Sequence, residues 1–400
     1  MEKSANAPTT RALAPGERWI LAGTILASSM AFIDGSALNV ALPALQASFQ
    51  ASGADLLWII NSYLLMLAAL ILVGGSLGDR LGRKKVFMIG IGLFSLASLA
   101  CGLAPAVGWM ITARIVQGIG GAMMIPGSLA IITASISPQR RGVAIGAWSA
   151  ATTLVTIVGP LLGGVFSDAG FWRGVFLINL PLGVAALLIL SFRVPESRDE
   201  SITGAIDLPG AAMVTLGLTG LTYGFISAPD DGFADPRVFG ALLVGVMALV
   251  AFVVVEMRRP QPMLPLNLFK SHTFAGTNLL TLCLYGGLSA GFFFLSLNLV
   301  QIQGYSKTQA GLSSLPFALL LTVISPWAGR FMDRYGPRLP LIVGPALVGA
   351  GFFYMAFSGV THGPADYWTA FLPGMLLVGF GMGFTHTLFS SARCSPPAHQ

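Results

Sequence analysis

Residues 75–85 read GSLGDRLGRKK, and residues 329–338 read GRFMDRYGPR. Both stretches fit the pattern G-x-x-x-D-R-x-G at an offset of 254 positions, and basic residues follow each match. Each copy stands at the end of an even-numbered apolar segment, counted from the N-terminus. Recurrence at the same place in the order of segments predicts two halves of the same orientation, which is a parallel repeat.

Apolar segments fill almost the whole chain of 400 residues, of which 54% are hydrophobic and 10% are charged. A soluble protein would carry about 25% charged residues. A spanning helix needs about 20 mostly apolar residues, and lipid satisfies no backbone hydrogen bond, so the segments are predicted to be helices. We therefore predict an all-α integral membrane protein with twelve transmembrane helices, at 18–42, 56–76, 86–105, 109–134, 142–165, 172–192, 207–228, 237–256, 273–299, 309–329, 339–359 and 366–390.

Lysine and arginine concentrate on one side of the predicted membrane, which holds 18 of the 22 basic residues. That side comprises the two termini and the connections after the even-numbered segments. Because basic loops stay cytoplasmic, we expect a multi-pass protein of the cell membrane with both termini in the cytoplasm. The net charge of +6 reflects this topology. Nucleic-acid binding is not expected, because no soluble domain is left to carry a binding groove.

The repeat predicts how the chain is divided. The segment at 309–329 takes the role of the segment at 56–76, so the second half begins at 273–299. We predict a disordered cytoplasmic tail at 1–17, a six-helix bundle at 18–192, an inserted helix pair at 205–257 and a partial bundle at 270–400. The second half then holds four helices where six are expected, and we interpret it as incomplete.

Ionisable groups inside a membrane are costly and mark functional sites. Asp34 is the carboxylate well inside a predicted span, and Arg114 is the intramembrane base. Burial favours the protonated form of a carboxyl group, so Asp34 is predicted to exchange protons and, when ionised, to attract a cation. The alternative is an Asp34 that faces a water-filled vestibule or bonds to Asn39 or Ser36. Arg114 either snorkels to the surface or holds Asp34 ionised, and Gln117 shares its helix face.

The repeated loop is predicted to act in conformational change. Its glycines allow close approach, its aspartates can accept from a helix N-terminus, and its arginines can hold carboxylates or lipid phosphates. The alternative is an ordinary solvated basic loop. The residues concerned are Gly75, Gly78, Asp79, Arg80, Gly82, Arg83, Asp333 and Arg334.

A second group of residues, in the segment at 142–165, is predicted to act through the shape of the helix backbone and not through side-chain chemistry. Gly159, Gly163 and Gly164 give the small-residue spacing that lets helices pack tightly, and Pro160 removes a backbone hydrogen bond and can kink the helix. Such a kink could seal or hinge a cavity. Ordinary tight packing explains the same residues.

Five stretches stand in order along the predicted helices: 33–43 (IDGSALNVALP), 75–85, 114–118 (RIVQG), 159–164 (GPLLGG) and 172–181 (WRGVFLINLP). With them the chain resembles the major facilitator superfamily, and within it the fourteen-helix drug:proton antiporters. The resemblance implies that Asp34, Asn39, Arg114 and Gln117 serve proton coupling or substrate binding. It also implies that Asp79 faces a helix beyond the twelfth. Two departures are Val155, where the family has glycine, and an end after twelve helices, which we interpret as a C-terminal truncation.

The expected function is a proton-coupled efflux transporter that exports hydrophobic, cationic compounds by alternating access and confers antibiotic resistance. The chain has no G-x-x-x-x-G-K-[ST] run for a nucleotide, so the proton gradient is the expected energy source and no cofactor is expected. The three cysteines share no metal-ligand spacing, and neither a catalytic residue nor a metal ligand is predicted, so the chain is not expected to be an enzyme.

Two alternatives remain at this point. One is a solute importer or facilitator of the same fold, and the other is a non-transporting truncated remnant. The expected partners are a small-molecule substrate and the lipid bilayer, and the chain is expected to be a monomer. The identity of the substrate and the existence of a periplasmic adaptor are left open.

Overall fold

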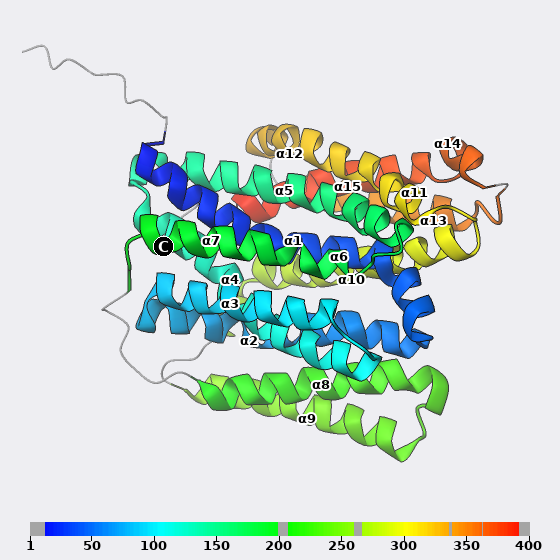
Figure 1. The fold of residues 1–400 in the computed structure, drawn as a ribbon, viewed down its shortest axis with the longest axis horizontal. Coiled ribbons are helices and arrows are strands. Elements are labelled where there is room, and N and C mark those ends of the chain that lie inside the picture. Colours follow the sequence, from blue (N-terminus) through cyan, green and yellow to red (C-terminus); the bar gives the residue numbers. More distant parts are fainter. Residues whose placement is uncertain (1–12, 199–206, 260–265, 336–337, 362, 392–400) are drawn as a thin grey trace, which may run out of the picture. The chain divides into compact units, whose positions relative to one another are not determined.

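The computed structural model of the protein describes residues 13–198, 207–259, 266–335, 338–361 and 363–391. The elements within these ranges are helices (Figure 1). The α-helices are α1 (Pro15–Phe49), α2 (Gly53–Leu81), α3 (Arg83–Gly102), α4 (Val107–Ser135), α5 (Pro138–Asp168), α6 (Gly174–Leu177), α7 (Asn179–Arg193), α8 (Leu208–Asp231), α9 (Pro236–Arg258), α10 (His272–Gln301), α11 (Lys307–Ser313), α12 (Leu315–Tyr335), α13 (Arg338–Ala356), α14 (Tyr367–Ala370) and α15 (Leu372–Ser391). Two short 3₁₀ helices are η1 (Leu266–Lys270) and η2 (Pro364–Asp366).

Each predicted span overlaps one helix, or two consecutive helices, of the structure. Eleven helices of the described chain are long and apolar enough to cross a membrane, and a twelfth span results if the bent pair Pro364–Ala370 and Leu372–Thr385 is counted as one. The prediction of an all-α membrane protein is therefore confirmed. The predicted tail at 1–17 lies largely outside the described residues, and α1 already begins at Pro15.

Three predicted spans are each divided into a short and a long helix, which the hydropathy of the sequence did not reveal. A proline follows each break within three residues. Proline lacks the N–H that would donate to the carbonyl one turn earlier, but it fits the first turn of a helix, so a new helix begins there. The breaks fall at Ile178, Ser314 and Phe371, and the prolines are Pro181, Pro316 and Pro373.

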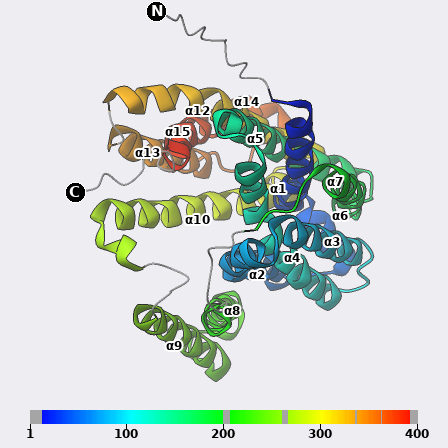
Figure 2. The same ribbon diagram turned by 90° about the vertical axis from the view of Figure 1, so that its left-hand side faces the viewer.

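One compact unit consists of Met1–Ala31, Trp58–Thr152 and Leu177–Met263. Within it α3 packs along α4, and α8 packs along α9, which lies beside it in both views (Figures 1 and 2). The axes of α3 and α4 come close because glycines face each other. A Cβ atom on Gly120 would lie 2.7 Å from the backbone nitrogen of Phe94, and one on Gly90 would lie 2.9 Å from the carbonyl oxygen of Gly120.

The second compact unit consists of Phe32–Leu57, Thr153–Phe176 and Leu264–Gln400. Here α15 packs against both α12 and α13. Glycines again set the distance between the helices: a Cβ on Gly351 would lie 2.6 Å from the Gly374 carbonyl oxygen, and one on Gly374 would lie 2.8 Å from that of Gly351. Met375 and Met382 of α15 belong to the buried apolar cluster of this unit.

Replacing Gly120 by alanine tests the glycine contact between α3 and α4. The added methyl group meets backbone atoms that have no freedom to rotate away. We expect the free energy of unfolding to fall by about 1–3 kcal/mol, the usual cost of overpacking. The measurement is thermal unfolding of the purified protein in detergent.

The matched control is Gly92→Ala on the same helix pair, where a Cβ meets no atom within 4 Å. Alanine favours a helix over glycine by about 1 kcal/mol, so this variant should be unchanged or slightly more stable. Equal losses in the two variants would mean that close packing at Gly120 is not the cause.

Candidate functional site

Asp34 lies in α1, and its side chain is fully buried, with 0% of its surface exposed. The two neighbouring polar side chains turn to the backbone of their own helix. Ser36 Oγ donates to the Phe32 carbonyl oxygen at 2.7 Å, and Asn39 Nδ2 donates to the Gly35 carbonyl oxygen at 3.2 Å. The structure thus buries a carboxyl group in a helix whose other buried polar side chains, Thr24, Ser28 and Ser29, are uncharged.

Arg114 lies in α4 and is 1% exposed, so its guanidinium is enclosed by protein. Its Nη1 donates to Gln117 Oε1 at 2.8 Å, and its Nε donates to the Ile59 carbonyl oxygen of α2 at 3.0 Å. The guanidinium carbon stands 4.4 Å from the centre of the Tyr63 ring, which attracts a cation through its π face. Cys101 Sγ donates to the same Gln117 oxygen at 3.7 Å.

These contacts give Arg114 a fixed place within its unit. The planar guanidinium uses its fork for two hydrogen bonds and its face for stacking, which an ammonium group could not do. Gln117, which was predicted to share a helix face with Arg114, accepts a hydrogen bond from it. Asp34 and Arg114 belong to different compact units, and their pairing stays a prediction.

The predicted glycines of α5 face α1 next to Asp34. A Cβ on Gly159 would collide with the Ser36 side chain, and one on Gly163 would collide with the Ala37 carbonyl oxygen. The α5 backbone therefore lies directly on the turn of α1 that follows the buried carboxyl group. Any larger side chain at these two positions would push α5 away from Asp34 and its neighbours.

An adjacent face of this stretch of α5, about 100° further around the helix, packs on α11. A Cβ on Gly164 would lie 2.6 Å from Cα of Thr308, and one on Gly311 would collide with the carbonyl oxygen of Pro160. The helix α5 runs continuously from Pro138 to Asp168 through this proline. The predicted small-residue motif is thus the place where α5 contacts both α1 and α11.

The repeated loop closes the start of α3. Gly82 has a φ of 114°, which side-chain-bearing residues rarely adopt, and a Cβ there would lie 2.7 Å from the carboxyl carbon of Glu196. That carboxylate accepts from the backbone nitrogens of Lys84 at 3.0 Å and Lys85 at 3.1 Å. An anion at a helix N-terminus is stabilised by the unpaired N–H groups and the helix dipole. Glu196 was not singled out in the sequence, because nothing there distinguishes it from Asp199 and Glu200, which follow it closely.

The other residues of the first loop copy interact locally. Asp79 forms an ion pair with Arg83 at 2.7 Å, and Arg80 Nε donates to Ser76 Oγ at 3.2 Å. A cavity of about 150 Å³ beside the ion pair is lined by Gly75, Gly78 and Gly127, among other residues. In the second copy, Asp333 and Arg334 belong to the end of α12, but their side chains lie outside the described part of the structure.

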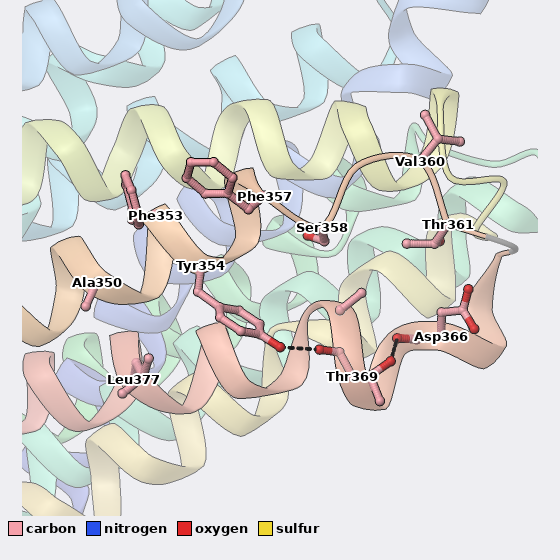
Figure 3. A pocket seen from close by; sticks show the side chains of 11 residues that line it. Ala350, Phe353, Tyr354, Phe357, Ser358, Val360, Thr361, Asp366, Thr369 and Leu377 are labelled. Atoms are coloured by element: carbon pink, nitrogen blue, oxygen red, sulfur yellow. Dashed lines mark hydrogen bonds between the residues drawn. The ribbon is translucent and has the colours of Figure 1, made fainter.

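A groove of about 700 Å³ lies between α13 and the short helices that precede α15 (Figure 3). The rings of Phe353, Tyr354 and Phe357 line it together with the carboxylate of Asp366, and Tyr354 Oη donates to the Thr369 carbonyl oxygen at 2.6 Å. Aromatic faces and a carboxylate suit an organic cation. Exposed aromatic residues are also typical of side chains that contact lipid at the membrane interface. No pattern in the sequence predicts that these residues line a common groove.

Comparison with known proteins gives a consistent result. The family model described as Major Facilitator Superfamily matches residues 24–395. The chain is 34% identical over 368 residues to the tetracenomycin C resistance and export protein of Streptomyces glaucescens, with 91% of this chain and 68% of that protein covered. It is 34% identical over 340 residues to the multidrug resistance protein Stp of Mycobacterium tuberculosis, with 84% and 63% covered.

Among solved structures, the fold is similar to that of a POT family transporter in complex with a thioalcohol-conjugated peptide. The TM-score is 0.70 at 13% sequence identity, and the match covers 96% of this chain and 84% of the other. At this identity the likeness concerns the fold alone. The chain spans about two thirds of the length of the two relatives described above, 68% and 63%.

Replacing Arg114 by lysine tests whether the guanidinium has a fixed place. Lysine keeps the charge but loses the hydrogen-bond fork and the stacking on Tyr63. Hydrogen bonds to charged groups contribute about 1.5–3 kcal/mol, so we expect a fall in stability of that order, measured by thermal unfolding in detergent. Arg237→Lys is the control, because Arg237 is exposed at the start of α9. A loss at Arg114 no larger than in this control would contradict the assignment.

Proposed function

The chain belongs to the Major Facilitator Superfamily, and on that premise we propose that it is a multi-pass exporter that exchanges hydrophobic, cationic compounds for protons. The observation that carries the proposal is the complete burial of the Asp34 carboxyl group within α1. The expected reaction is transport across the membrane by alternating access, with no covalent chemistry on the substrate.

A carboxyl group inside a membrane has two states of very different cost. Its ionised form costs at least about 2.5–3.5 kcal/mol at the bilayer centre, whereas the protonated form carries no charge. Either a proton or an organic cation can neutralise the ionised carboxylate. Once one of them is bound, the carboxylate no longer attracts the other. This competition at Asp34 is the simplest way to couple the outward movement of a cation to the inward movement of a proton.

In this proposal Arg114 supplies the positive charge that keeps Asp34 ionised at one stage of the cycle. Its rigid setting on Tyr63 and Gln117 supports such a role, because a fixed charge exerts a reproducible field. The glycines Gly159 and Gly163 hold α5 on the turn beside Asp34, so movement of α5 would alter the surroundings of the carboxyl group.

The names of the relatives support export of toxic compounds. One is called a resistance and export protein and another a multidrug resistance protein. Cationic character of the substrate rests on the charge of Asp34 and not on those names. In a one-for-one exchange of a monovalent cation for a proton no net charge crosses the membrane, so the pH difference is the proposed energy source, at about 1.4 kcal/mol per pH unit.

The proposal also includes an orientation with both termini in the cytoplasm and a monomeric state. A solute importer of the same fold is the second candidate. The direction of the proton gradient distinguishes an importer from an exporter, since an importer accumulates substrate inside when the outside is acidic. A protein that moves no compound under either gradient would be the non-transporting alternative.

Replacing Asp34 by asparagine in proteoliposomes tests the coupling. Asparagine is close in shape but cannot bind or release a proton, so we expect uphill export of a lipophilic cation such as ethidium to fall at least tenfold. Exchange of labelled for unlabelled ethidium without a gradient should fall as well, because the variant lacks the carboxylate that is proposed to bind the cation.

Asp55→Asn is the control for loss of a carboxylate. Asp55 is partly exposed at the start of α2, where it accepts from Ser52. We expect this variant to export at nearly the rate of the unaltered protein. Uphill export by Asp34→Asn at the unaltered rate would disprove the proposed role of this carboxyl group.

A further inference from the structure

Asp168, the last residue of α5, binds the first turn of another helix. Its Oδ1 accepts from the backbone nitrogen of Lys307 at 3.0 Å, and its Oδ2 accepts from that of Thr308 at 2.7 Å. Lys307 Nζ donates in return to the Ser167 carbonyl oxygen at 3.2 Å. Three hydrogen bonds thus connect the end of α5 with the start of α11, about 140 positions later in the chain.

The remaining N–H group of this first turn is satisfied locally. Ser306 and Gln309 form a capping box, in which Ser306 Oγ accepts from the Gln309 nitrogen and Gln309 Oε1 accepts from the Ser306 nitrogen. The start of α11 therefore has its own cap, and Asp168 takes the two donors that the cap leaves over. The capping box is sufficient to begin α11. We therefore attribute the contact with Asp168 to the attachment of α5 to α11.

The same junction is closely packed one turn further along α5. Gly164 meets the backbone of Lys307 and Thr308, and Gly311 meets the Pro160 carbonyl oxygen. Backbone contact of this kind has little room to yield, so the two helices are either seated against each other or apart. The hydrogen bonds of Asp168 exist in the seated arrangement and are lost when the helices separate.

We propose that Asp168 is a positioning residue of the transport cycle: it holds α5 against α11 and stabilises the state in which this end of the transporter is closed. The inference rests on the proposed function, since α5 belongs to the first predicted half and α11 to the second. A cycle that opens this end must break the three hydrogen bonds, and substrate binding or release must supply the free energy. Loss of the carboxylate should shift the ratio of closed to open molecules about tenfold.

The test measures the junction directly in the full 400-residue chain in lipid nanodiscs. Spin labels are attached at Ala169 and Leu312, which are exposed at the two sides of the contact, after Cys283 and Cys394 have been replaced by serine. Dipolar EPR spectroscopy gives the distribution of distances between the labels. We expect Asp168→Asn to lower the ratio of the shorter to the longer distance about tenfold relative to the unaltered side chain, and Asp168→Glu to restore part of the shorter distance.

The matched control is Asp235→Asn. Asp235 also accepts from two N–H groups at a helix start, those of Arg237 and Val238, but it caps its own helix α9 and joins no second element. It should leave the distance distribution unchanged. A common effect in both variants, or no change in Asp168→Asn, would overturn the proposal.

A second variant keeps Asp168 and removes a donor. Lys307 is the first residue of α11, where proline is well tolerated, and Ser306 before it has φ −66° and ψ 158°, which proline requires of its predecessor. Lys307→Pro removes one backbone N–H and the ammonium group, so it should shift the distances in the same direction as Asp168→Asn. Retention of the closed distribution in this variant would count against the proposal even if Asp168→Asn failed to fold.

Transport by the same variants separates this inference from the proposed function. We expect Asp168→Asn to change the KM and the turnover of ethidium export by different factors, because it alters the balance of two states and leaves Asp34 in place. If the unaltered protein exports nothing, the proposed function is wrong, while the EPR distances still decide whether Asp168 holds the junction.

Discussion

Helices that lie in a bilayer gain little from burying apolar surface against each other, because lipid tails are as apolar as their side chains. Contact between them depends on close approach, which gives dispersion and weak hydrogen bonds, and on a few well-satisfied polar groups. The chain meets this constraint with glycine. Gly90 and Gly120 bring α3 and α4 together, and Gly351 and Gly374 do the same for α13 and α15.

The helix α5 makes close glycine contacts with two neighbouring helices. Gly159 and Gly163 lie on α1, and Gly164 lies on α11. A helix with small residues on two faces can transmit a displacement from one neighbour to the other, because no long side chain absorbs it. The buried carboxyl group of Asp34 stands one turn from this contact, so chemistry at Asp34 and movement at α11 have a short mechanical connection through α5.

The positions of the spans could be predicted from the sequence because hydropathy is a local property that a bilayer enforces over about 20 residues. The breaks near Pro181, Pro316 and Pro373 were missed, since other prolines such as Pro160 lie inside continuous helices, and the difference depends on packing. The buried groups Asp34 and Arg114 stood out as charges in apolar surroundings. Contacts of Glu196 and Asp168 could not be found, because each joins positions more than a hundred residues apart.

The position of Glu196 in the chain determines when the start of α3 acquires its hydrogen-bond acceptor during synthesis. Glu196 binds the backbone nitrogen of Lys84 at the start of α3, although it follows Lys84 by 112 positions and lies beyond the end of α7. A ribosome therefore delivers α3 to the membrane well before the group that completes its first turn has been synthesised. Until α7 has been inserted, those N–H groups have to be satisfied by water or lipid headgroups, so α3 and α7 reach their final state together during biogenesis.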